Sequence, residues 1–358
     1  MKYLPEIQSL RGLCALGVLL NHNFGPGFGL SSSSNSERYI FEFILHIIAP
    51  GASMVLVFFV ISGFVLSPTL TAISQLPNFF IRRIFRIMPA LWVSLVLAIF
   101  VFNFLGREIK PEYYKAFYLM DISLNQPIWS LQYEMLAYLY FPIQLYISRR
   151  IGILSSLLII IFLICLNINS HGYSFYGILV YPTALLCFQL GIEVPRFGKK
   201  LVALIHSGDI LFYIGLICIL IPLPIYNLVF TYNLGICNSI IAIGAFVLIS
   251  VISYGEFHLK KIFLFTPIVF LGTISYSFYL FHLPILEFVY SNLPHTWITW
   301  SNTHGPFGNS ILYIGIMRIF LTLIILIPMS WISYRYVELP MIRVGNKLAK
   351  LFFQRRLH

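Results

Sequence analysis

Two ionisable residues interrupt the first apolar stretch of the chain. Arg11 and His22 are eleven residues apart, about three helical turns, so a helix places both on one side and roughly 16 Å apart along its axis. Ionisable side chains within apolar stretches are costly and by default mark function. A neutral imidazole can act as a general base or carry a group covalently. Taken singly, Arg11 also fits an arginine at an interface, and His22 a hydrogen-bonded structural histidine.

A second segment contains three arginines within five residues. Arg82 and Arg86 share one face of a helix, and Arg83 lies beside them. Because the planar, forked guanidinium group suits phosphates, this cluster predicts a phosphate-binding site. Two alternatives stay open: arginines that hold a loop in the cytoplasm, and a contact with anionic lipid headgroups.

A carboxylate follows a tryptophan and a serine at 129–134. Ser130 is expected to be the N-cap of a helix, which places Glu134 about one turn inside that helix. Desolvation disfavours the charge of such a carboxylate, so we expect Glu134 to be paired or partly protonated. It can orient a histidine or accept a proton. The alternative is a role at the positive end of the helix dipole.

A fourth segment, 275–284, has a polar face. Ser275, Tyr279 and His282 fall on one side of a helix at spacings of four and three. Such a face either lines a cavity or packs through interhelical hydrogen bonds.

The composition identifies the elements that must position these residues. Apolar residues make up 59% of the 358 residues and charged residues only 10%, and the mean hydropathy is +0.88. Globular domains carry about 25% charged residues, so a cytosolic enzyme, a disordered chain and a nucleic-acid binder are excluded despite the net charge of +11. The five cysteines lie in apolar stretches without a CxxC pair and predict neither a disulfide framework nor a metal site. We expect an all-α, polytopic membrane protein.

Apolar runs of about 20 residues predict about ten transmembrane spans. Arg11 interrupts the first run early and no small-residue cleavage site follows, so we expect the first span to stay in the mature protein. The serine-rich segment at 31–36 predicts an outer loop. The spans are 8–27, 43–67, 88–106, 130–148, 151–168, 174–192, 209–226, 234–253, 266–290 and 311–334.

Lysine and arginine set the predicted orientation. With the N-terminus inside, seventeen of the 23 lie on the cytoplasmic side and four on the outer side, while Arg11 and Arg318 lie within spans. This is a strong positive-inside bias, so both termini are expected to be cytoplasmic. It also disfavours splitting the stretch around Pro284 into two crossings. We expect a transmembrane domain at 1–340 and a basic cytoplasmic tail at 341–358.

Taken in order, the motifs resemble the acyltransferase 3 family of integral-membrane acyltransferases, and the resemblance covers nearly the whole chain. In this family the residues around the glutamate are often more polar than residues 132–135 of this chain. Longer members carry an appended extracytoplasmic esterase-like domain, which we do not expect because the chain ends soon after the tenth span. The matching segments are Arg11 with His22, Phe58–Phe64, Arg82–Pro89, Trp129–Leu131 with Glu134, Ser275–Pro284 and Tyr334–Pro340.

The resemblance implies an enzyme that moves an acyl group, most often acetyl, from cytosolic acyl-coenzyme A to a hydroxyl of a bacterial cell-surface or lipid-linked saccharide. His22 would then be the general base or the acyl carrier, with Glu134 or His282 orienting it. Arg82, Arg83 and Arg86 would hold the nucleotide phosphates, and Arg11 would lie beside the pantetheine arm. The residues expected to line the cavity are Trp129, Ser275, Tyr279 and His282.

No resident cofactor and no metal is expected. The expected partners are acyl-coenzyme A, the saccharide acceptor and membrane lipids, without nucleic acid, and the expected location is a bacterial inner (plasma) membrane. The alternative function is a proton-coupled transporter that uses the same intramembrane polar residues. A lipid-binding scaffold is a third hypothesis, and it leaves His22 unexplained.

Overall fold

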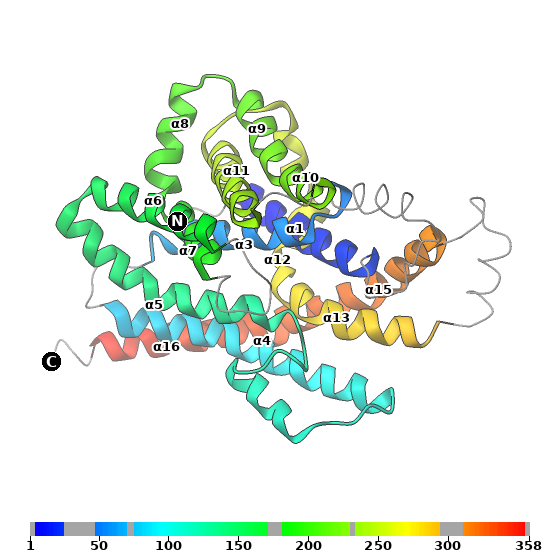
Figure 1. The fold of residues 1–358 in the computed structure, drawn as a ribbon. Coiled ribbons are helices and arrows are strands. Elements are labelled where there is room, and N and C mark those ends of the chain that lie inside the picture. The colour runs from blue at the N-terminus through cyan, green and yellow to red at the C-terminus, as the bar shows by residue number, and fades with distance from the viewer. Residues whose placement is uncertain are drawn as a thin grey trace. The chain divides into compact units, whose positions relative to one another are not determined.

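The computed structural model describes residues 4–24, 47–69, 75–170, 181–229, 233–293 and 311–354. Within these ranges the chain forms helices joined by short connections, and no β-strand is present (Figure 1). The predicted all-α class is therefore confirmed. The predicted outer loop at 31–36 and most of the connection at 291–310 lie outside the described residues.

The chain divides into two compact units. Unit 1 comprises Met1–Val18, Ser34–Phe79 and Tyr133–Thr273, and unit 2 comprises Leu19–Ser33, Phe80–Gln132 and Ile274–His358. The helices α1, α4 and α5 each contribute a segment to both units. In chain order the elements are α1 (Pro5–Phe24), α3 (Gly51–Leu66), α4 (Leu76–Phe104), η3 (Pro111–Tyr118), α5 (Ile128–Ile151), α6 (Ile153–Asn169), α7 (Tyr181–Glu193), η5 (Val194–Gly198), α8 (Lys199–Leu204), α9 (Gly208–Leu220), α10 (Pro222–Val229), α11 (Leu234–Tyr254), η6 (His258–Leu264), α12 (Thr266–Thr273), α13 (Ser275–Ser291), α15 (Ile311–Ser333), η7 (Tyr334–Glu338) and α16 (Leu339–Gln354).

In unit 1, α3 and α7 approach each other through glycines. A Cβ at Gly63 would lie 2.3 Å from the carbonyl oxygen of Phe188, and one at Gly191 would lie 2.1 Å from that of Val60. No side chain fits in either place, so the two backbones touch. Close packing through small residues is typical of helices in membranes, where apolar burial does not drive helix association.

A buried asparagine joins α6 to α7 and α11 in unit 1. Asn167 of α6 donates from Nδ2 to the carbonyl oxygen of Gly235 at 2.9 Å and to Ser239 Oγ at 3.0 Å, both on α11. Thr183 of α7 donates to Asn167 Oδ1 at 2.6 Å. Interhelical hydrogen bonds of this kind fix the register of helices that present few other polar groups.

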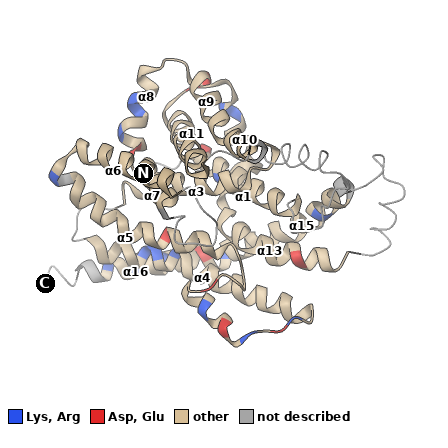
Figure 2. Cartoon of the chain, viewed as in Figure 1, with Lys and Arg blue, Asp and Glu red and all other residues tan. Residues whose placement is uncertain are grey.

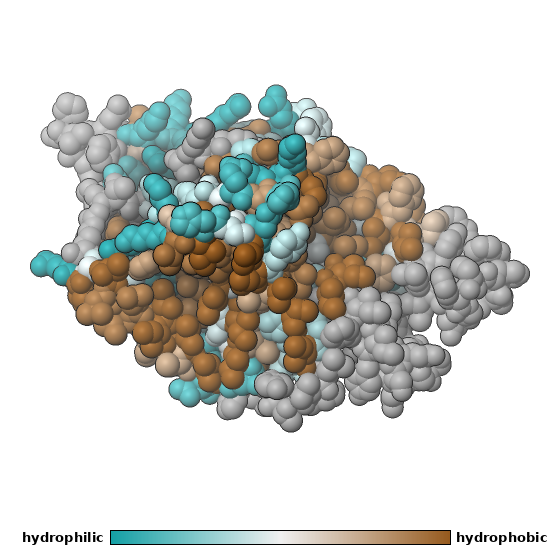
Figure 3. All heavy atoms as spheres, turned by 90° about the horizontal axis from the view of Figure 1, so that it is seen from above, coloured by the Kyte–Doolittle hydropathy of each residue, from teal (hydrophilic) through white to brown (hydrophobic). Residues whose placement is uncertain are grey.

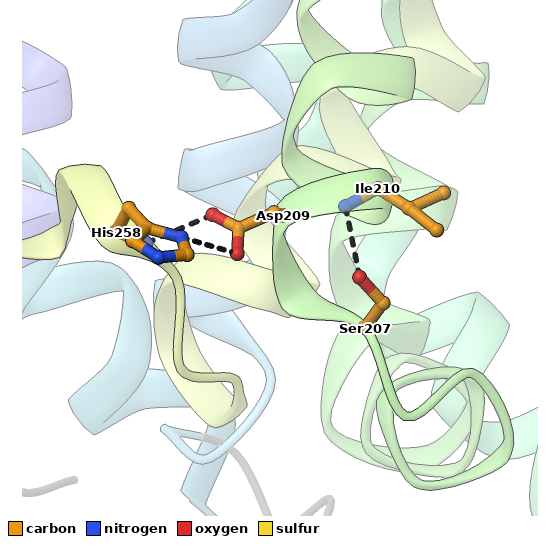
Figure 4. A network of polar contacts seen from close by, with 4 residues as sticks. All are labelled: Ser207, Asp209, Ile210 and His258. Atoms are coloured by element: carbon orange, nitrogen blue, oxygen red, sulfur yellow. Dashed lines mark hydrogen bonds and ion pairs between the residues drawn. The ribbon is translucent and has the colours of Figure 1, made fainter.

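The start of α9 is held at the surface by Asp209 (Figure 4). Its Oδ1 accepts the backbone N–H of His258 at 2.8 Å, and its Oδ2 lies 2.6 Å from His258 Nδ1. Ser207 caps the same helix by accepting the N–H of Ile210 at 3.4 Å. The His258 side chain is 89% exposed, so this pair joins a connection to a helix end at the surface of unit 1.

In unit 2, α13 packs along α15, and a buried serine ties it to the turn that follows α15. Ser277 Oγ lies 2.8 Å from Ser333 Oγ and donates to Glu338 Oε1 at 2.5 Å. Glu338 belongs to η7, one turn of π-helix between α15 and α16. Farther along, α16 lies against α4, since a Cβ at Gly345 would be 2.6 Å from Phe85 Cβ.

Among the described residues, four helices are long and apolar enough to cross a membrane: Leu76–Phe104, Gly208–Tyr226, Leu234–Tyr254 and Ile314–Leu351. A fifth candidate is α12 with α13, two helices bent by 75° at a short break. Most of the ribbon in Figure 2 is uncharged, and apolar residues cover much of the face in Figure 3. These features identify an integral membrane protein, while the full set of ten spans stays a prediction.

The structure changes three of the predicted segments. The third span begins at Leu76 and not at residue 88, because the helix continues through the arginine run that an apolar window leaves out. The predicted span 266–290 is broken at Ile274, while Pro284 lies inside α13. The break follows Gly272, where a Cβ would be 1.7 Å from the carbonyl oxygen of Gln8. Much of the predicted tail forms α16.

Candidate active site

Two histidines predicted for the site meet in unit 2. His22 lies in the last turn of α1 and His282 lies on α13, and their ring centroids are 5.2 Å apart with the ring planes at 41°. The residues are 260 positions apart in the sequence, so the fold and not local spacing brings them together. His282, which the sequence offered as an orienting group for His22, lies beside its ring.

The surroundings of His282 fix its tautomer. The side chain is 1% exposed, and Nδ1 lies 2.5 Å from the carbonyl oxygen of Tyr279, to which only a protonated nitrogen can donate. Nε2 is then the unprotonated nitrogen, and it has no hydrogen-bond partner among the residues that the structure describes. Because buried polar atoms are nearly always satisfied, an open imidazole acceptor marks a place where a ligand or a proton can bind.

The Tyr279 side chain continues this cluster toward the start of α5. Its ring centroid is 5.6 Å from that of His282, and its hydroxyl reaches the carbonyl oxygen of Pro127 at 3.5 Å. Ser130 Oγ donates to the same carbonyl at 2.9 Å. Ser130 is the third residue of α5, so the prediction that it is the N-cap is wrong. Its hydroxyl donates to a carbonyl group in the turn before the helix.

Asn125 is a polar residue of this region that the sequence analysis did not single out. It is 3% exposed, and its Nδ2 donates to the carbonyl oxygen of Leu280 at 3.0 Å and contacts Ser94 Oγ at 3.4 Å. Its Oδ1 has no hydrogen-bond partner within the described part of the chain. The signal available in the sequence was its position four residues before Trp129, which is half-buried at the start of α5.

The arginine cluster lies on α4, as the helical spacing predicted. Arg82 is exposed, and Arg83 and Arg86 are half-buried. Tyr276 of α13 donates from its hydroxyl to the carbonyl oxygen of Ile87 at 2.8 Å, directly after Arg86. Since His282 is six residues farther along α13, about 9 Å along its axis, one helix connects the arginine cluster with the histidine pair.

Two other predicted site residues belong to unit 1. Arg11 donates to Gln8 Oε1 at 3.3 Å on the same helix. Glu134 accepts a hydrogen bond from the hydroxyl of Tyr138 at 2.5 Å. Because α5 begins at Ile128, Glu134 lies beyond the first turn, where the helix dipole has little effect. A dipole role for Glu134 is therefore disfavoured.

The remaining predicted residue, Ser275, is buried at the start of α13, and its hydroxyl has no hydrogen-bond partner among the described residues. Ser275, Tyr279 and His282 are all buried, as are most of the residues between them, so burial does not single out one face of the helix. That they line a cavity stays a prediction. Within the described ranges, no group of three or more His, Cys, Asp or Glu side chains is placed to hold a metal ion.

Residues 4–335 match the model of a protein family described as an acyltransferase domain. The chain belongs to the acyltransferase 3 family. This family membership covers every predicted site residue. It also identifies the histidine pair as part of an acyltransferase domain.

Two relatives illustrate the similarity. Peptidoglycan O-acetyltransferase OatA of Listeria monocytogenes is 25% identical over 396 residues, which cover 96% of this chain and 56% of the relative. O-acetyltransferase OatA of Staphylococcus aureus is 24% identical over 391 residues, covering 97% of this chain and 58% of the relative. The chain thus spans little more than half the length of these relatives. No solved structure matches it.

Proposed function

We propose that this chain is a membrane-bound O-acetyltransferase that moves an acetyl group from acyl-coenzyme A to a saccharide hydroxyl. The observation that carries the proposal is the contact between His22 and His282 within an acyltransferase 3 domain. Two imidazoles in contact, one of them buried with an open nitrogen, suit the removal of a proton from a hydroxyl group.

In the proposed reaction, His22 acts as the general base. A nitrogen of its imidazole takes the proton from the acceptor hydroxyl while the hydroxyl oxygen bonds to the thioester carbonyl carbon. The carbon–sulfur bond then breaks, and the coenzyme A thiolate takes the proton back from the imidazolium. The centroid separation of 5.2 Å allows the N–H of His22 to point at Nε2 of His282, which would orient the ring.

The donor would bind along α4 and α13. Arg82, Arg83 and Arg86 suit the phosphates of the nucleotide because guanidinium groups form charge-assisted, forked hydrogen bonds with phosphate oxygens. The bond between Tyr276 and Ile87 supports a short path from this cluster to His282. Arg11, on the same continuous helix as His22 and three turns before it, would lie beside the pantetheine arm.

The proposed topology has about ten spans in a bacterial inner (plasma) membrane, with both termini in the cytoplasm. The excess of lysine and arginine on the predicted inner side supports this orientation. It would place the arginine cluster at the cytosolic face, where acyl-coenzyme A is found. The acceptor would be a cell-surface or lipid-linked saccharide, and the name of the Listeria relative makes peptidoglycan the first acceptor to test.

The experiment is acetyl transfer by the full chain in proteoliposomes, with protein-free liposomes as the control. Isotope-labelled acetyl-coenzyme A is supplied with soluble peptidoglycan fragments, with other surface saccharides or with no acceptor. We expect release of coenzyme A thiol and label on a saccharide hydroxyl, both dependent on the acceptor. A chain that releases no thiol with any acceptor, but carries protons across the bilayer, would be the alternative transporter.

A further inference from the structure

Arg318 is a buried charge that the proposed reaction does not use. It is the one charged residue of α15, and it is 2% exposed. A guanidinium group in an apolar helix is tolerated only when it is paired or hydrogen-bonded, so its partners define its role. Its Nε donates to Asn23 Oδ1 at 2.5 Å, a second guanidinium nitrogen donates to the Asn23 carbonyl oxygen, and the cation lies 5.4 Å from the ring centroid of Tyr290.

These bonds cap the C-terminal end of α1. The last four carbonyl groups of a helix lack partners within it, and Asn23 is the residue before the last in α1. A cation at this end is also favoured by the helix dipole. Arg318 of α15 therefore satisfies the Asn23 carbonyl group, and it fixes the Asn23 side chain at the same time.

A second set of contacts holds the same turn on α15. Asn23 Nδ2 donates to the carbonyl oxygen of Gly315 at 3.0 Å, one helical turn before Arg318. The ring of Phe24 lies over Gly315, where a Cβ would come within 2.1 Å of it. The two residues that follow His22 are thus docked on α15, and the His22 ring contacts His282 of α13.

We propose that Arg318 is a positioning residue for His22. Through its hydrogen bonds to Asn23, Arg318 fixes the orientation of the last turn of α1. This orientation places the His22 imidazole against His282. The inference rests on the proposed function for its effect on acetyl transfer, but its geometric part does not require that function. A helix end without this clamp would fray, and the imidazole would lose its fixed direction.

The experiment compares four variants of the full chain in proteoliposomes: Arg318→Met, Arg318→Lys, Asn23→Leu and the double variant Asn23→Leu/Arg318→Met. Lysine keeps the charge but cannot reproduce the forked contact. The double variant removes both partners and so leaves no unpaired buried charge, which protects the test against a failure to fold. Arg107→Met is the matched control, because Arg107 forms a half-exposed ion pair with Glu287 in the same unit.

Two readouts are taken: kcat and KM for acetyl transfer, and the rate at which diethylpyrocarbonate modifies His22, followed by peptide mass. We expect kcat to fall about 10- to 100-fold in Arg318→Met and Asn23→Leu, because a small misplacement of a reacting group costs this much, with the donor KM nearly unchanged. The double variant should lose no more than either single variant. Arg318→Lys should fall between wild type and Arg318→Met, and Arg107→Met should match wild type.

The modification rate of His22 should change at least about threefold in Arg318→Met and stay at the wild-type value in Arg107→Met, whether or not the protein transfers acetyl. An unchanged rate and unchanged kcat in Arg318→Met would overturn the proposal, as would losses that simply multiply in the double variant. If Arg318→Met and the double variant both fail to insert, Arg318→Lys decides: wild-type values in both readouts would overturn it. If the modification rate of His22 changes in Arg318→Met although the protein acetylates no acceptor, the positioning role of Arg318 stands and the proposed function is rejected.

Discussion

Two histidines of this chain have polar neighbours of opposite character. His258 at the surface of unit 1 meets both carboxylate oxygens of Asp209, and its side chain is 89% exposed (Figure 4). His282 in unit 2 is 1% exposed, meets the ring of His22, and has an Nε2 without a hydrogen-bond partner among the described residues. The first is exposed and paired with a carboxylate; the second is buried and has an open acceptor.

The difference distinguishes a structural contact from a contact that can take part in a reaction. An exposed ion pair contributes little to stability because water screens it, and Asp209 with His258 joins a connection to the start of α9. A buried imidazole with one nitrogen held by a backbone carbonyl has a fixed tautomer and one reactive position. We therefore expect changes in the pair of His22 and His282 to affect turnover and changes in the exposed pair to leave it intact.

The largest effect is expected for His22→Ala. Removing a general base costs about 10²- to 10⁴-fold in rate, so kcat for acetyl transfer should fall by that factor while the protein stays in the membrane. The measurement is label transferred from acetyl-coenzyme A to the acceptor in proteoliposomes. Turnover like that of wild type would remove His22 from the mechanism.

A smaller loss is expected for His282→Phe, which keeps an aromatic ring but removes both nitrogens. Since the ring of His22 would lose its acceptor but not its own basicity, kcat should fall about 10- to 100-fold. Steady-state kinetics with both substrates varied would show the loss in kcat. If only KM changed, His282 would bind substrate and would not orient His22.

The arginine cluster should act on the donor alone. Charge-assisted hydrogen bonds contribute about 1.5–3 kcal/mol each. Replacing Arg82, Arg83 and Arg86 one at a time with glutamine should therefore raise the KM for acetyl-coenzyme A about 10- to 100-fold. The acceptor KM should hardly change. An effect confined to the acceptor would contradict this assignment, and failure to insert would favour a purely topological role for these arginines.

The smallest effect is expected for His258→Ala. Exposed ion pairs are weak, so kcat and both KM values should stay within about twofold of wild type. This variant is the matched histidine control for His22→Ala and His282→Phe in the same assay. A loss as large as that of His22→Ala or His282→Phe would mean that the exposed pair of Asp209 and His258 also contributes to turnover.

Some local features followed from local patterns in the sequence. The segments around Ser275–Pro284 and Arg82–Pro89 are helical, as their spacings predicted, whereas the predicted N-cap at Ser130 is wrong. The composition predicted helices, because only helices satisfy their own backbone within an apolar run. Helix ends were less well predicted: hydropathy missed the twelve residues before the expected third span, since charged residues can continue a helix beyond the membrane.

Contacts between segments that are distant in the chain could not be predicted from the sequence. Nothing in the local pattern joins Asn23 to Arg318 or Asn125 to Leu280, because these pairs form only when the helices pack. The same holds for the break at Ile274, which follows the close approach of Gly272 to α1. Arg318 did carry a signal, as the one charge within an apolar helix, but its partner was not readable.

The most direct test of the pair of His22 and His282 as the reacting centre is protection from chemical modification by the donor. Diethylpyrocarbonate is applied to the full chain in proteoliposomes with increasing acetyl-coenzyme A, and peptide mass gives separate rates for His22 and His258. We expect acetyl-coenzyme A to slow the modification of His22, with half-maximal protection near its KM, and to leave the rate at His258 unchanged. Equal rates at His22 with and without saturating donor would contradict it.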